Sequence, residues 1–225
     1  MGAVLAWPQP LAANDAAVGT PAPDAGLEDL LDGRRLWKGG SFPAAPSVHA
    51  TGHAALDAVL PAGGWPGSAL SEILHAAEGV GEIRLAWPAL ARLSQAGERI
   101  VLVAPPHRPF APAWQSAGIA LERLHLVNAE SPKDALWAAE QCLRSGSCGA
   151  VLCWPQLADD RALRRLQVAA ETGQTLALAW RPLQAARNPS PAALRIAIDA
   201  AASALRVLKC RGGMAPPQSI PFNAH

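Results

Sequence analysis

Residues 70–85 of the chain read LSEILHAAEGVGEIRL. The first five residues form a short apolar run, which is typical of a buried strand. Gly79 and Gly81 follow and indicate a turn, because glycine readily adopts positive φ angles. The apolar spacing over residues 83–96 then predicts a helix. A strand, a glycine turn and a helix in this order form the setting of a phosphate-binding loop.

A working phosphate-binding loop ends in Gly-Lys-Ser/Thr, where the lysine contacts phosphates and the hydroxyl group binds Mg²⁺. Here Gly81 is followed by Glu82 and Ile83, so a carboxylate replaces the cation and an aliphatic side chain replaces the metal ligand. A carboxylate repels a triphosphate. Glu78, Gly79, Gly81 and Glu82 therefore form either a relic of such a loop or an ordinary turn before a helix. Either interpretation predicts no bound cofactor.

Alternation of short apolar runs with amphipathic segments continues along the chain. Further strands are predicted at residues 99–104, 124–127, 150–154, 176–180, 192–198 and 203–209, and further helices at 54–60, 111–117, 132–144 and 159–172. This pattern predicts an α/β fold with a mainly parallel sheet flanked by helices. The last two strands are expected to form an antiparallel edge.

The chain divides into four predicted parts. Residues 1–26 are rich in Ala and Pro and are expected to form a flexible arm, and residues 27–48 combine a short helix with a linker. Residues 49–211 form the main domain, and residues 212–225 are expected to be a flexible tail. A length of 225 residues suits one such domain with extensions.

Composition excludes several classes of function. The net charge of +1 provides no global attraction to nucleic acid or membrane, and no apolar run reaches the ~18 residues of a membrane span. No secretory signal is recognisable, so a cytoplasmic protein is expected. The four cysteines and six histidines show no metal-ligand spacing, and no nucleophile motif is present. We therefore predict no metal site and no catalytic residue.

Several phrases of the sequence resemble the RecA-like ATPase family. Residues 60–67 (LPAGGWPG) with 70–73 are similar to the approach to that family's phosphate-binding loop, and residues 113–119 (AWQSAGI) to a later helix and turn. Residues 207–211 (VLKCR) resemble its late Lys-x-Arg strand end. Trp37-Lys38-Gly39, the Gly-Gly-Trp-Pro phrase and the degenerate loop resemble the ImuA group of SulA-like, RecA-like proteins. The resemblance covers residues 27–213 and implies a RecA-like P-loop core.

The resemblance implies a non-catalytic accessory protein of SOS-induced translesion DNA synthesis, an error-prone repair process. Its implied partners are an ImuB-type Y-family pseudo-polymerase, RecA and, indirectly, a DnaE-type error-prone polymerase. The implied location is the cytoplasm, with association to the nucleoid after DNA damage.

The chain departs from an active RecA-like enzyme at three places. These are Glu82 in the loop, Trp154 after a strand that lacks a terminal acid, and Pro106 where the family has a glutamate. Phosphoryl transfer needs charge neutralisation, a metal and a positioned water, so the resemblance predicts a pseudo-ATPase. Two alternatives stay open. One is a SulA-like SOS cell-division inhibitor that binds FtsZ, and the other is a divergent ATPase that takes its cation from Arg84 or Lys209.

Three groups of residues are candidates for partner binding: Leu30, Leu31 and Trp37 of the N-terminal element; Arg161, Arg164 and Arg165 of a predicted helix; Lys209 and Arg211 of a strand end. The first group either docks on a partner or folds back on its own core. The arginines share one helix face and either bind DNA or an acidic partner or are simply solvated. The strand-end pair either contacts a partner or lies in solvent. Direct DNA contact is left open by the sequence.

Overall fold

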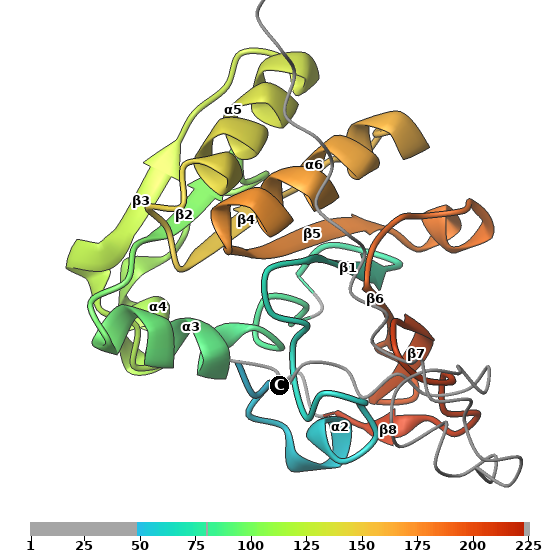
Figure 1. Ribbon diagram of the computed structural model, residues 1–225. Helices are drawn as coiled ribbons and strands as arrows, with labels where there is room; N and C mark the ends of the chain where they lie inside the picture. Colours follow the sequence, from blue (N-terminus) through green and yellow to red (C-terminus); the bar gives the residue numbers. More distant parts are fainter. Residues whose placement is uncertain (1–48, 80, 223–225) are drawn as a thin grey trace, which may run out of the picture. The chain divides into compact units, whose positions relative to one another are not determined.

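The computed structural model describes residues 49–79 and 81–222 (Figure 1). The elements run in the order α2 (Ala54–Asp57), β1 (Leu70–His75), α3 (Trp87–Gln95), β2 (Ile100–Val103), α4 (Ala111–Ser116), η1 (Leu121–Arg123), β3 (Leu124–Val127), α5 (Pro132–Arg144), β4 (Ala150–Cys153), α6 (Asp160–Gly173), β5 (Leu176–Pro182), η2 (Leu183–Arg187), β6 (Leu194–Asp199), β7 (Ala204–Cys210) and β8 (Ile220–Pro221). The predicted arm, Leu30, Leu31 and Trp37 lie outside the described residues.

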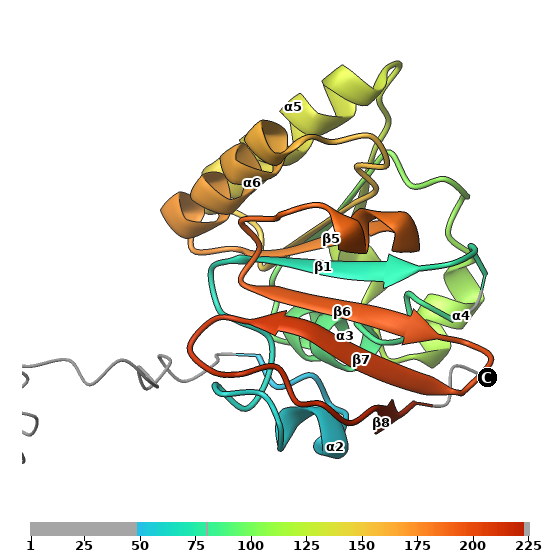
Figure 2. The ribbon, with the colours of Figure 1, turned by 90° about the vertical axis from the view of Figure 1, so that its right-hand side faces the viewer.

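The strands form one eight-stranded sheet in the order β3-β2-β4-β5-β1-β6-β7-β8. Strands β1 to β6 pair in parallel, whereas β7 runs antiparallel to both β6 and β8. Figure 2 shows β1, β6 and β7 side by side. The predicted mainly parallel sheet with an antiparallel edge is confirmed.

Helices cover both faces of the parallel strands, with α5 and α6 on one face and α3 and α4 on the other (Figure 1). Successive side chains of a strand point to opposite faces. In β1, Ile73 accordingly packs in the cluster that contains Leu90 of α3, whereas Leu70 packs in the cluster that contains Leu163 of α6. All six residues of β1 are buried, including the polar Ser71 and His75 and the charged Glu72, as expected for a strand covered on both faces.

The helix predicted over residues 83–96 begins later than expected. Residues 82–86 form turns, and α3 starts at Trp87. Pro88 lies in its first turn. Proline has no backbone N–H and is tolerated in the first turn of a helix but not in its interior, so the helix begins immediately before it.

The end of the chain is packed rather than loose as far as Phe222. Ile220 of β8 pairs with Leu205 of β7, and both are buried. The buried Phe222 ring lies edge-on to His53, with ring centroids 5.3 Å apart. The expectation of a flexible tail from residue 212 is therefore wrong for this part, because its apolar side chains cover the antiparallel edge of the sheet.

Candidate functional site

The loop after β1 holds the four residues of the expected phosphate-binding relic. Gly79 and Gly81 both have a φ of 79°, which favours glycine. Glu82 is buried, and its Oε1 accepts a hydrogen bond from the Gly79 backbone N–H at 3.3 Å. The carbonyl oxygen of Glu82 accepts a second bond from Nε1 of Trp180 at 3.2 Å. The loop is thus closed on itself and held to β5 by Trp180.

Glu78 of this loop and Arg84, which follows the loop, are engaged with other side chains. Glu78 Oε2 lies 2.8 Å from Nε2 of His107, which follows β2. The guanidinium of Arg84 stacks over the Trp87 ring, 5.4 Å from its centroid. The loop is therefore linked to the next strand connection, and Arg84 is held at the start of α3.

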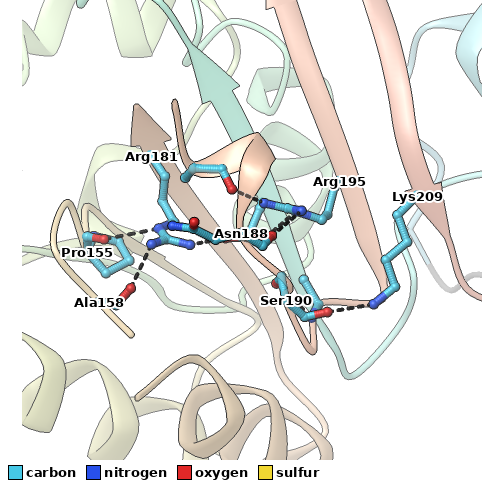
Figure 3. Close-up of polar contacts among 10 residues, drawn as sticks. Pro155, Ala158, Arg181, Asn188, Ser190, Arg195 and Lys209 are labelled. Carbon is cyan, nitrogen blue, oxygen red and sulfur yellow. Dashed lines mark hydrogen bonds and ion pairs between the residues drawn. The ribbon is translucent and has the colours of Figure 1, made fainter. Parts of the chain in front are cut away.

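Lys209 near the end of β7 and Arg211 just after it lie at the opposite end of the strands from this loop. Lys209 pairs in register with Arg195 near the start of β6, whereas the loop follows the end of the parallel strand β1. The Nζ of Lys209 donates a hydrogen bond to the Ser190 carbonyl at 2.7 Å (Figure 3). Burial lowers the pKa of Lys209, and the neighbouring charges of Arg211 and Arg195 lower it further. Lys209 cannot supply the missing loop cation, which removes one basis of the divergent-ATPase alternative.

Arg161, Arg164 and Arg165 are all exposed on α6. Arg164 pairs with Asp160 at 3.3 Å, and Arg165 pairs with Glu140 of α5, which also binds Arg144 at 2.7 Å. Arg211 likewise pairs with Glu171 of α6 at 3.1 Å. Acidic neighbours therefore offset much of the positive charge that the helix face carries in the sequence.

A buried ionic cluster, which the sequence analysis missed, lies in the middle of the sheet. Glu72 of β1 is fully buried between Arg181 of β5 and Arg195 of β6. Its Oε1 lies 2.6 Å from Arg181 Nη1, and its Oε2 lies 2.7 Å from Arg195 Nε. The signal is present in the sequence, since each of the three charged residues lies in a strand that is otherwise mostly apolar.

Backbone carbonyl groups accept further hydrogen bonds from both arginines (Figure 3). Arg181 donates to the carbonyls of Pro155 at 3.2 Å and Ala158 at 2.7 Å. Arg195 donates to the carbonyls of Ala185 at 2.7 Å and Asn188 at 3.0 Å. The cluster therefore fixes two surface connections, the one after β4 and the one after β5.

A cavity of about 570 Å³, which we call the α5–α6 pocket, opens beside the connection after β4. It lies at the carboxyl ends of β2 and β4 and is lined mainly by apolar side chains. Two of these are strongly exposed: Trp137 of α5 is 60% exposed and Leu157 is 90% exposed. Exposed apolar surface around a cavity is characteristic of a binding site. The pocket cannot be recognised in the sequence, because its lining comes from four separate segments.

Cys153 lies on the wall of this pocket, and burial raises its pKa to about 12. All four cysteines are free thiols. No group of three metal-ligating side chains occurs among residues 49–79 and 81–222. In the same ranges, no helix is long and apolar enough to cross a membrane.

Comparisons with known proteins find similarity to SulA over part of the chain. Residues 68–177, a segment of 110 in a chain of 225, match the model of the family described as "Cell division inhibitor SulA". A crystal structure of SulA from Pseudomonas aeruginosa shares 29% sequence identity with this chain, covering 50% of it and 97% of the SulA chain, with a TM-score of 0.43. No curated protein matches the chain. The segment from the start of β1 to the start of β5 is therefore similar to the family described as cell division inhibitor SulA.

Proposed function

We propose that this chain is a non-catalytic, RecA-like accessory protein of SOS-induced translesion DNA synthesis. In this role it bridges RecA and an ImuB-type Y-family pseudo-polymerase and reaches a DnaE-type error-prone polymerase indirectly. It works in the cytoplasm and joins the nucleoid after DNA damage. The ATPase machinery is lost, so that the fold serves as a docking scaffold.

The observation that carries this proposal is the extent of the fold beyond its SulA-like segment. The family match ends at residue 177, two residues into β5. The chain continues with β6, β7 and β8, which complete the sheet. A chain that served only as a SulA-like inhibitor would not need these additional strands. The sequence resemblance to the ImuA group, in contrast, extends through the Lys-x-Arg strand end at residues 209–211.

The state of the loop after β1 supports the non-catalytic part of the proposal. A phosphate placed in this loop would meet the buried Glu82 carboxylate, whose Oε2 forms no hydrogen bond within the described residues. Bringing an anion close to a buried carboxylate is unfavourable, since little water is present to screen the two charges. The expected consequence is that ATP neither binds nor is hydrolysed.

The test measures binding of the full chain to three purified proteins: RecA filaments, the ImuB-type protein and FtsZ. Binding to the first two, together with loss of damage-induced mutagenesis in cells that lack this chain, would support the accessory role. Arg161→Glu on α6 is then compared with Arg123→Glu, an exposed arginine of η1, to test the basic helix face. Failure to bind either RecA or the ImuB-type protein would overturn the proposal.

The family match favours a second candidate, a SulA-like division inhibitor. In that case the chain would bind FtsZ and block its GTP-dependent assembly, and it would not bind the translesion proteins. An FtsZ assembly assay with the same protein preparation distinguishes the two candidates.

A further inference from the structure

We propose that the α5–α6 pocket is a two-fold interface at which two copies of this chain associate. In this arrangement Leu157 of each copy enters the cavity of the other and packs against Trp137 there. The inference rests on the shape, the charge and the rigidity of the pocket, and it does not depend on the proposed function.

The surface around the α5–α6 pocket carries both a projecting apolar side chain and a hollow. Leu157 is 90% exposed and projects from the connection after β4, and it lies on the rim of a cavity of about 570 Å³. A two-fold interface requires that one surface carry both the projecting group and the hollow that receives it. Burial of a large apolar side chain stabilises an interface, and a symmetric interface buries two such side chains.

The charges around the pocket are balanced. Its charged lining residues are two acids, Glu130 and Glu140, and two bases, Lys133 and Arg165. Glu140 and Arg165 already pair with each other. A strongly acidic or basic partner would find no complementary field here, whereas an identical copy can place the Glu130 and Lys133 that remain opposite one another.

The projecting residue is held in place before any association. Arg181 binds the carbonyl groups of Pro155 and Ala158 on either side of Leu157 (Figure 3). The backbone N–H of Gln156 also donates to the Trp154 carbonyl at 2.9 Å. A group that is already ordered loses less conformational entropy on binding. The buried ionic cluster thus has a role at the surface, since it positions Leu157.

The first test measures the mass of the full chain in solution across the micromolar range by light scattering and sedimentation. The wild type is expected to form a dimer, and Leu157→Asp is expected to be monomeric at the same concentrations. Met214→Asp is the matched control, because Met214 is 93% exposed but lies outside the pocket. Circular dichroism confirms that each variant is folded.

The second test identifies the contact itself. A tagged chain with Trp137→Cys and an untagged chain with Leu157→Cys are mixed and oxidised. A disulfide between the two chains is expected, whereas each variant oxidised alone should form little disulfide-linked dimer. A monomeric wild type, or a dimer that Leu157→Asp leaves intact, would overturn the proposal. If the wild type is a monomer that binds a different protein, and Leu157→Asp abolishes that binding, the proposal is also overturned. The pocket would then be the binding site for that partner.

Discussion

Glu72 and Arg181, 109 residues apart in the sequence, form a buried ion pair of 2.6 Å between neighbouring strands. Arg195, on the strand at the other side of β1, lies 2.7 Å from the second oxygen of the same carboxylate. One acid therefore ties three strands together and offsets the charge of two buried arginines. This relationship accounts for the position of two surface connections, and it leads to the first prediction.

Glu72→Gln should destabilise the fold by about 3–5 kcal/mol, because it leaves two buried guanidinium groups without their counter-charge. Urea unfolding monitored by circular dichroism provides the measurement. The control is Arg164→Gln, which removes an exposed ion pair with Asp160 and should cost less than about 1 kcal/mol. Equal effects of the two substitutions would contradict a structural role for the cluster.

Gly173→Ala should destabilise the contact between the C-terminal ends of α5 and α6. A Cβ atom at this position would lie 1.8 Å from the carbonyl oxygen of Leu143. Because the obstacle is backbone, the two helices must separate, at a typical cost of about 1–3 kcal/mol. Thermal or urea unfolding measures the change. Thr172→Ala, an exposed neighbour, should change stability by less than about 0.5 kcal/mol; a comparable loss there would argue against this contact.

Cys153 should resist alkylation in the native protein. Burial raises its pKa to about 12, although the charge of Arg181 acts in the opposite direction. At pH 8 its thiolate fraction is then on the order of one in ten thousand, and the thiolate is the reactive form. Timed labelling with iodoacetamide followed by mass spectrometry is the measurement. Cys142, which is only half buried, serves as the internal comparison. Labelling of Cys153 as fast as that of Cys142 would contradict the prediction.

The stability should fall as the pH drops below the ordinary pKa of histidine. Burial lowers the pKa of His49, and the charge of Arg92 lowers it further while Glu98 opposes the shift. Between the lowered folded value and the ordinary value near 6.5, the unfolded chain binds more protons at this site than the folded chain. The contribution of neutral His49 to the free energy of unfolding is therefore complete above this pH window and is lost as the pH falls through it.

Urea unfolding at a series of pH values from neutral to mildly acidic measures this effect. His49→Gln should flatten the dependence in that range, whereas His125→Gln, at an exposed position of β3, should leave it unchanged. A slope that persists in His49→Gln would assign the dependence to other groups.

Local sequence determined those elements whose start and end signals lie within them. Helix α5 and strand β3 were predicted with the bounds observed. For α5 the reason is visible in the chain, since Ser131 caps the helix by accepting a bond from the Asp134 N–H, and Pro132 occupies the first turn. The late start of α3 is also encoded in the chain, by Pro88 in its first turn. The apolar spacing of residues 83–96 points instead to an earlier start.

The alternation of strands and helices, the antiparallel edge and the replacement of the loop lysine by Glu82 can all be read from the amino-acid sequence. These features depend on residue type and short-range spacing. In contrast, the contacts of Glu72 with Arg181 and Arg195, the packing of Phe222 on His53, and the cavity that Trp137 and Leu157 share arise only when the chain folds. Each of these contacts joins residues far apart in the chain, and a one-dimensional pattern carries no information about which distant residues the packing of a sheet brings together.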